Sequence, residues 1–363
     1  MNYKYVKPGH ATSDPNETVR FLDVDGKLIQ EYKPSEETKK KLVEMYKNMI
    51  RSRQWDLYSL TLQKTGRLGT FAPALGEEAA LTGIGYNLNK EDWFIPHYRV
   101  LPTQLARGIS MDKIYSYWQG SEIGSAFAGT NTLPLHVVIG SQVPIAAGVA
   151  QALKFQGKKA LAMVTIGNGG TNEGEFHEGL NMASVRKWPL VTVVMNNQWA
   201  ISVPEHNSYI VKTLSQRAKS YDMPGVRVDG NDLIAVNEVM QEVYDFVREG
   251  NGPVLVEMVT WRQGQHTTSD NPRVYRSREL EVEKEKWEPF HRIEAYLLSE
   301  KLITEEDIKV WSEAAYEEAK AAYALSKELC EATTFDHIYD YTYEKLPADL
   351  VRQKETNRKL FGK

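Results

Sequence analysis

The stretch of residues 160–201 contains two short apolar runs, residues 160–166 and 190–195, with a glycine-rich turn and a helical pattern between them. The runs are too short to cross a membrane, and the first is bounded by glycines, which is typical of buried parallel strands. Residues 174–187 predict a helix that ends before Pro189. Strand, turn, helix and strand form one βαβ unit, and open α/β sheets bind their ligands at the carboxyl ends of such strands.

Polar residues follow both predicted strands. Asn168 lies within a run of glycines after the first strand, and Asn197 follows the second strand, 29 positions further along. Amide oxygens, glycine N–H groups and a helix start fit a divalent cation held between protein oxygens and a phosphate. A dinucleotide site would instead need G-x-G-x-x-G and an acid at the end of the second strand, and both are missing. The remaining alternative is an ordinary crossover whose glycines only make a tight turn.

The spacing resembles the thiamine diphosphate motif, G-D-G followed further along by N-N. The segments GGTNEGEFHEGLN and NNQWAIS are similar to the alpha subunits of two-subunit 2-oxo acid dehydrogenase E1 components. This resemblance, which covers roughly residues 35–350, implies three ligands of Mg²⁺: Asn168, Asn197 and the main-chain carbonyl of Trp199. It also implies that Gly169 and Gly170 contact the cofactor.

One position departs from the family pattern. The metal-binding acid of the family is replaced by Asn168 in this chain. An amide oxygen can coordinate Mg²⁺ but adds no negative charge, so we expect weaker metal binding, with loss of activity as the alternative.

Two segments nearer the amino terminus extend the resemblance. In DWFIPHYRV, a guanidinium suits a pair of diphosphate oxygens and a tyrosine hydroxyl can add a hydrogen bond. The family pattern implies that Tyr98 and Arg99 contact the cofactor diphosphate and the substrate pocket. In TLPLHVVIGSQVPIAAGVAQALKFQ, Ile139 is implied to wedge between the two cofactor rings. Taken alone, a surface ion pair would explain Arg99. The small residues at positions 146–148 and 150 indicate either tight internal packing or, by the resemblance, packing at a subunit interface.

The polar segment WRQGQHTTSDNPRVYRSREL predicts a loop. A single loop histidine is usually only solvated, but the family has a histidine on a loop over its active site. The match covers Arg262, His266, Asp270, Tyr275 and Arg276. It implies that His266 is catalytic, hydrogen-bonding the diphosphate region and assisting acyl transfer to a lipoyl arm.

Three hydroxyl residues follow this histidine. They occupy positions that are regulatory phosphorylation sites in mitochondrial relatives: Thr267, Thr268 and Ser269. The sequence does not indicate whether they are phosphorylated here.

The composition is that of a globular protein. The 363 residues are 42% hydrophobic and carry a net charge of −4, which indicates no general attraction to nucleic acid. The single cysteine, Cys330, excludes an internal disulfide framework and fits a reducing compartment. Residues 1–20 lack the apolar core of a secretory signal, and no later segment approaches the length of a membrane span. We therefore expect a cytoplasmic protein that does not interact with a membrane.

Alternating strands and helices predict an α/β fold with a doubly wound, mainly parallel sheet. The resemblance implies the thiamine diphosphate-binding fold with extra N- and C-terminal helices. Outside the central unit we expect a helix from Ser35 to near Gly66, strands at residues 225–228 and 253–261, and a helix capped at residues 231–232.

The chain is expected to have three parts. Residues 1–34 form an N-terminal arm, which is either a frayed tail or a segment that wraps a neighbouring subunit. Residues 35–350 form the thiamine diphosphate-binding domain, with charged helices from about residue 281, and residues 351–363 form a tail.

The resemblance implies decarboxylation of a 2-oxo acid on thiamine diphosphate, followed by acyl transfer to the lipoyl group of an E2 acyltransferase. Overall similarity favours pyruvate, which makes the chain an oxidoreductase subunit of a pyruvate dehydrogenase complex, between glycolysis and acetyl-CoA. The sequence does not indicate which E2 core it joins.

The alternatives are a branched-chain 2-oxo acid or acetoin dehydrogenase alpha subunit, which would share every motif, and a non-catalytic alpha-like subunit, motivated by Asn168. A nicotinamide-linked oxidoreductase is disfavoured because the glycine fingerprint fails. The family takes the glutamate at the cofactor's aminopyrimidine from a beta chain, so we expect an obligate E1 beta partner in an α2β2 heterotetramer.

Overall fold

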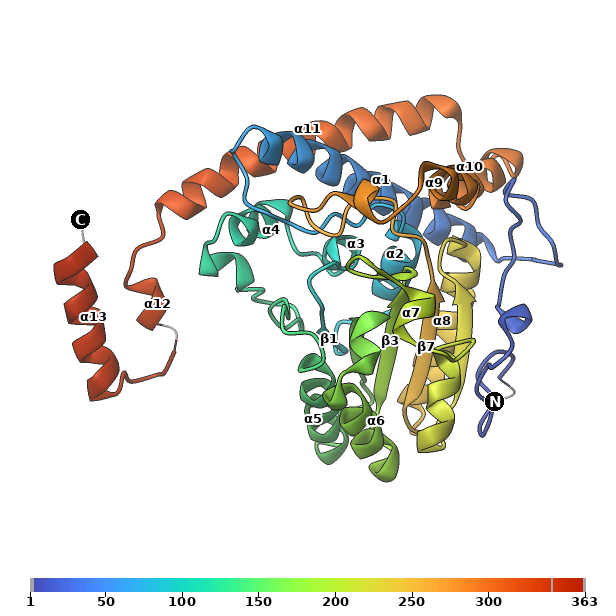
Figure 1. Ribbon diagram of the computed structural model, residues 1–363, viewed down its shortest axis with the longest axis horizontal. Helices are drawn as coiled ribbons and strands as arrows, with labels where there is room; N and C mark the ends of the chain where they lie inside the picture. The colour runs from blue at the N-terminus through green and yellow to red at the C-terminus, as the bar shows by residue number, and fades with distance from the viewer. Residues whose placement is uncertain (1–2, 341, 362–363) are drawn as a thin grey trace.

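The computed structural model describes residues 3–340 and 342–361, and a parallel sheet of five strands lies at its centre (Figure 1). Across the sheet, the strands follow in the order β1 (Trp93–Ile95), β2 (Ala162–Gly167), β3 (Leu190–Asn196), β7 (Val254–Val259) and β6 (Gly225–Asp229). All neighbouring pairs are parallel. Every residue of β3 is buried, as expected for a strand that is covered on both faces. The predicted α/β class with a mainly parallel sheet is confirmed.

The central βαβ unit forms where the sequence predicted it. The helix α6 (Gly174–Arg186) connects β2 to β3, and a short 3₁₀ helix, η3 (Gly169–Asn172), fills the turn after β2. The residue that caps the C-terminus of α6 is Lys187, whose φ of 49° is left-handed. Gly167 pairs with Met195 across the two strands, so the carboxyl ends of β2 and β3 lie level with each other.

Helices cover both faces of the sheet, as Figure 1 shows. The covering helices are α1 (Glu36–Lys64), α2 (Glu78–Tyr86) and α8 (Leu233–Arg248) on one face, and α5 (Gln142–Phe155) with α6 on the other. Met163 packs in the first core and its neighbour Val164 in the second, because successive side chains of a strand point to opposite faces. The sheet is therefore doubly wound.

Helix caps explain where two predicted helices begin. The Ser35 side chain accepts a hydrogen bond from the Thr38 N–H at the start of α1, and Asp232 accepts one from the Ala235 N–H at the start of α8. Both predicted starts are confirmed. The helices α3 (Leu101–Ala106) and α4 (Met111–Trp118) were not predicted, because both are short and begin without a side-chain cap hydrogen bond.

The remaining short elements lie in the connections. They are η1 (Pro15–Glu17), η2 (Glu122–Ser125), β4 (Trp199–Ala200), β5 (Val203–Pro204), α7 (Glu205–Ser208), η4 (Ser215–Tyr221) and η5 (Pro272–Val274). The strands β4 and β5 form a small antiparallel hairpin directly after β3. No helix in the described part of the chain is long and apolar enough to cross a membrane.

The N-terminal segment packs along the chain's own sheet. Ala11 and Val19 form parallel bridges to Gly225 and Val228 of β6, and Phe21 is buried. A frayed tail is therefore excluded for residues 11–22, which extend the edge of the sheet instead. Residues 1 and 2 of the predicted arm lie outside the described residues.

The C-terminal part is helical, as predicted. Its helices are α9 (Arg278–Glu285), α10 (Pro289–Ser299), α11 (Glu305–Glu331), α12 (His337–Asp340) and α13 (Ala348–Phe361). The helix α11 packs on α1 and α4, whereas α13 lies apart from the body of the molecule in Figure 1 and buries none of its residues. Residues 362 and 363 of the predicted tail lie outside the described residues, and the division into arm, domain and tail stays a prediction.

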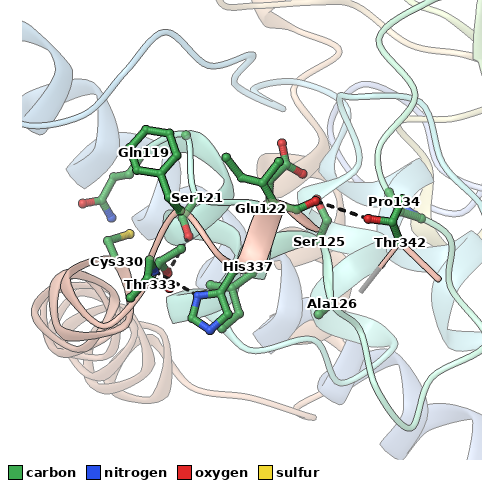
Figure 2. A pocket seen from close by; sticks show the side chains of 15 residues that line it. Gln119, Ser121, Glu122, Ser125, Ala126, Pro134, Cys330, Thr333, His337 and Thr342 are labelled. Carbon is green, nitrogen blue, oxygen red and sulfur yellow. Dashed lines mark hydrogen bonds between the residues drawn. The ribbon is translucent and has the colours of Figure 1, made fainter. Parts of the chain in front are cut away.

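A groove of about 1130 Å³ lies between η2 and the segment that joins α11 to α12 (Figure 2). Ser121 and Thr333 are hydrogen-bonded at its edge, with 3.1 Å between their hydroxyl oxygens. None of the predicted site residues lines this groove.

Candidate active site

The predicted site residues follow the carboxyl ends of strands, except Ile139, which lies just before α5. Tyr98 and Arg99 come after β1, Asn168 and the two glycines after β2, Asn197 and Trp199 after β3, and His266 after β7. Because these strands are parallel, their carboxyl ends meet at one edge of the sheet. The topology thus gathers residues that are up to 168 positions apart, as in the Tyr98–His266 contact.

Asn168 is a buried amide without a partner in this chain. Its backbone is fixed, since its N–H donates to the Met195 carbonyl over 3.1 Å and its own carbonyl accepts from the Thr171 hydroxyl over 2.6 Å. The residue is 1% exposed, yet neither Oδ1 nor Nδ2 makes a hydrogen bond. A buried amide left unsatisfied is unfavourable, so this side chain suits a polar group from outside the chain.

The glycines after β2 allow close approach of the chain itself. A Cβ on Gly170 would lie 2.3 Å from Cγ2 of Ile139, and one on Gly169 would lie 2.6 Å from Cβ of Ala200. Ile139 therefore packs directly against the glycine turn. Gly167, by contrast, has nothing within 4 Å of its Cβ position.

Asn197 has a fixed side-chain orientation. Its Nδ2 donates to Oε1 of Glu77 over 2.8 Å, and its Oδ1 accepts from the Trp199 N–H over 3.3 Å. Gln198 between them has a left-handed φ of 69°, which turns the chain from β3 into β4. Trp199 is buried. The three predicted metal ligands lie in two adjacent turns, with Asn168 after β2 and Asn197 and Trp199 after β3.

Arg99 ties three segments together. It donates to the Pro73 carbonyl, and its Nη2 donates to the His266 carbonyl over 2.7 Å. Its Nε lies 3.4 Å from Oε1 of Glu77. Burial raises the pKa of the Glu77 carboxyl, while the charge of Arg99 acts in the opposite direction. Arg99 is buried as well, so its positive charge is screened little by solvent.

His266 lies between a tyrosine and two arginines. Its Nε2 is 3.3 Å from the Tyr98 hydroxyl, and its Nδ1 is 3.3 Å from both Nη2 of Arg99 and Nη1 of Arg262. A guanidinium only donates, so Nδ1 must accept and Nε2 carries the proton of the neutral ring. Burial, then the charges of Arg99 and Arg262, lower the pKa of His266 to about 4.

The loop that carries His266 is held by the residues that matched the family pattern. The His266 N–H donates to Asp270 over 2.8 Å, and Asp270 also accepts from the Tyr275 hydroxyl. Arg262 donates to the same hydroxyl over 2.8 Å, and Arg276 donates to the Arg262 carbonyl. All five matched residues thus form one hydrogen-bonded loop.

The three hydroxyl residues of this loop differ in their contacts. Thr268 exchanges hydrogen bonds with Phe71, and Ser269 lies 3.0 Å from the Thr70 hydroxyl and is exposed. Ser269 is therefore the most exposed of the three.

The cation donors at this edge are neutral. No group of three or more His, Cys, Asp or Glu side chains that could hold a metal occurs within residues 3–340 and 342–361. The predicted donors are two amide oxygens and one main-chain carbonyl, and the Asn168 amide is unpartnered. Oxygen donors of this kind fit a hard cation whose charge is balanced by a phosphate ligand.

Glu77 is the residue that the sequence did not single out. It immediately precedes α2 in a segment that reads as a loop and a buried helix start, and only its contacts across the fold connect it to the site. The sequence offered only an indirect signal: two consecutive acids, Glu77 and Glu78, stand at the start of a helix that reads as buried, and buried acids usually have charged partners. It did not indicate which partner they would meet.

The chain matches the dehydrogenase E1 component family over residues 46–334. The pyruvate dehydrogenase E1 component subunit alpha of Mycoplasma pneumoniae is 39% identical over 348 residues, covering 96% of this chain and 97% of that protein. The protein of the same name from Mycoplasma genitalium is 38% identical over 348 residues, with the same coverage of 96% and 97%. The one from Staphylococcus aureus strain Mu50 is 36% identical over 352 residues, covering 96% of this chain and 95% of that protein.

Proposed function

Because the chain belongs to the dehydrogenase E1 component family, we propose that it is the alpha subunit of a pyruvate dehydrogenase E1 component. It is an oxidoreductase subunit that decarboxylates pyruvate in a thiamine diphosphate-dependent reaction and transfers the acetyl group to the lipoyl group of E2. Relatives that bear the name of this subunit match over nearly the whole chain. The observation that carries the proposal is the buried, unpartnered Asn168 amide beside the Asn197 turn, at the sheet edge that also holds Arg99 and His266.

Thiamine diphosphate, when bound, supplies an electron sink that makes loss of CO₂ from a 2-oxo acid feasible. In this proposal, the oxygens of Asn168, Asn197 and the Trp199 main chain hold Mg²⁺, with Gly169 and Gly170 at the phosphate. Arg99 adds a buried positive charge for the diphosphate.

Two further residues orient the cofactor in this proposal. Ile139, packed against Gly170, supports the bend between the cofactor rings, and the Tyr98 hydroxyl contributes a hydrogen bond near the diphosphate. Ile139 lies next to the glycine turn proposed for the phosphate, and Tyr98 lies next to His266. Side chains that are fixed by packing and hydrogen bonds favour a single geometry of the bound cofactor.

His266 is the proposed acid–base group. Its ring holds a proton at Nε2 in the neutral form, and a bound diphosphate would raise its pKa, because an anion nearby favours the imidazolium. Reduction of the lipoyl disulfide during acetyl transfer leaves one sulfur as a thiolate that needs a proton. We assign the delivery of that proton to His266 in its imidazolium form, which returns to the neutral ring.

The proposal includes partners and a location. An E1 beta subunit completes the site in an α2β2 heterotetramer, and a lipoyl-bearing E2 receives the acetyl group. Nucleic acid and membranes have no part in this function, and the cytoplasmic location stays a prediction. Enzymes that act on pyruvate, branched-chain 2-oxo acids or acetoin would share these motif residues. The assignment of pyruvate as the substrate therefore rests on the names of the relatives.

The test is calorimetric binding of thiamine diphosphate with Mg²⁺ to the chain purified with its beta partner, followed by turnover of pyruvate, branched-chain 2-oxo acids and acetoin. We expect binding and preferential turnover of pyruvate. Preference for another substrate would reassign the subunit within the family. No cofactor binding by an intact complex would overturn the proposal and support the non-catalytic alternative that Asn168 suggests.

A further inference from the structure

Glu77 is a buried carboxylate at the cation end of the site. It is 0% exposed and lies at the start of α2. Its Oε1 accepts a hydrogen bond from Nδ2 of Asn197 over 2.8 Å and lies 3.4 Å from Nε of Arg99. Its second oxygen, Oε2, is buried and has no hydrogen-bond partner. The contacts with Asn197 and Arg99 both involve Oε1, so the carboxylate could accept further hydrogen bonds.

The contact with Glu77 decides which way the Asn197 amide faces. A carboxylate only accepts hydrogen bonds, so the amide must present its nitrogen to Glu77. Its oxygen is then held on the opposite side, toward the Trp199 N–H and the turn. Partners that orient a metal ligand in this way typically change metal affinity by about 10- to 100-fold when they are removed.

The charge of Glu77 also matters, because the proposed ligands themselves are neutral. Asn168 contributes an amide where an acid would bring a negative charge, and both of its polar atoms are unpartnered. The Glu77 carboxylate accepts a hydrogen bond from the nitrogen of the Asn197 amide, and the oxygen of the same amide is the proposed ligand. The charge of Glu77 is therefore close to the proposed cation. Its carboxylate is paired with a guanidinium, since Nε of Arg99 lies 3.4 Å from Oε1.

We propose that Glu77 is a positioning residue of the cation site, which fixes the Asn197 amide and supplies the negative charge that Asn168 does not. This inference rests on the proposed function, since it assumes that Asn168 and Asn197 face a divalent cation. Glu77 acts through Asn197 and is not itself assigned as a ligand.

The test measures Mg²⁺ affinity in the presence of thiamine diphosphate, by calorimetry, for four proteins purified with the beta partner. These are the natural chain, Glu77→Gln, Asn168→Asp and the double variant. Gln keeps the shape and one acceptor oxygen, so Glu77→Gln isolates the charge. We expect Glu77→Gln to weaken Mg²⁺ binding about tenfold in the natural background. The same change should cost less than about threefold in the Asn168→Asp background, where the introduced carboxylate provides the charge.

A matched control is Glu78→Gln. Glu78 is the neighbouring buried glutamate and pairs with Arg53 through a 2.5 Å contact, away from Asn197. It should affect thermal stability but leave Mg²⁺ affinity within about twofold. A Glu77→Gln cost that is absent, or equal in both backgrounds, would overturn the inference, because a packing role does not depend on the charge at residue 168. Failure of the natural chain to bind the cofactor would instead overturn the proposed function.

Discussion

The environment of His266 is dominated by positive charge. Arg99 and Arg262 both lie 3.3 Å from Nδ1, and Arg276 is buried behind them with its guanidinium on the Arg262 carbonyl. This concentration of guanidinium groups disfavours an imidazolium and favours an anionic ligand. This preference agrees with the diphosphate ligand proposed above.

We expect His266 to remain neutral above about pH 4 in the ligand-free protein, because burial and the two arginines lower its pKa to about 4 from the ordinary 6.5. Between about pH 6.5 and pH 4 the unfolded chain binds this proton, whereas the folded chain binds it only below about pH 4. This residue therefore contributes stability that is present above pH 6.5 and is lost as the pH falls from 6.5 toward 4. Hydrogen–deuterium exchange of the imidazole C2–H measures the pKa.

The variant Arg262→Gln should raise the pKa of His266, since it removes one of the two charges that face Nδ1. The exchange is measured on peptides after digestion of the protein. His10, which is exposed, is followed in the same sample as the reference for the exchange conditions. An unchanged pKa of His266 in this variant would contradict the electrostatic explanation.

At the scale of elements, the turn between β2 and α6 is shaped by packing as well as by ligand access. Gly170 leaves the space that Ile139 and Ile166 fill, whereas Gly148 on α5 faces open space. Glycine is thus required for packing in the turn after β2, whereas the glycine on α5 has room for a side chain. Ala146 and Ala147 beside Gly148 are buried within the chain, which is the internal packing that the sequence left as one alternative.

The variant Gly170→Ala should destabilise the protein by roughly 1–3 kcal/mol, because its Cβ would lie 2.3 Å from Ile139 and 2.8 Å from Ile166. Thermal or urea unfolding measures the change. Combination with Ile139→Ala should recover part of the loss, since that change removes the closest atom. Gly148→Ala is the matched control and should stabilise by about 0.5–1 kcal/mol, as expected for an open helical position. Equal effects of the two alanines would contradict this account.

At the scale of the whole molecule, one buried arginine joins the N-terminal segment and the helix α10 to the sheet. Arg292 of α10 contacts Asp229 at the end of β6 over 3.0 Å and donates to the Leu22 carbonyl over 2.6 Å. Asp232 at the start of α8 accepts from the Leu22 N–H over 2.7 Å. Although burial alone would raise it, the charges of Arg292 and Arg20 lower the pKa of Asp229. The N-terminal segment is therefore an integral part of the fold.

The variant Arg292→Met should reduce the free energy of unfolding by about 3–5 kcal/mol, because it leaves Asp229 buried with one partner fewer. It should also expose residues 11–22 to limited proteolysis. The control is Arg51→Met, which breaks a pair with Glu318 that is partly exposed and should change stability by less than about 1 kcal/mol. Similar stability of the two variants would show that the buried cluster does not hold the N-terminal segment in place.

The sequence by itself determined the βαβ unit, the helix starts at Ser35 and Asp232, and the grouping of Asn168 with Asn197. These features depend on periodicity, caps and the rule that parallel strands end at one edge, all of which act over short stretches of chain.

Only the tertiary structure decided that the N-terminal segment runs along β6 and that Glu77 meets the site. Glu77 contacts Asn197 across 120 positions, and Val19 pairs with Val228. Such contacts depend on how distant elements pack, and no local pattern encodes them. The same reason explains the lowered pKa of His266, because both its burial and the charge of Arg99, which reaches it from another strand end, come from the packing of distant elements.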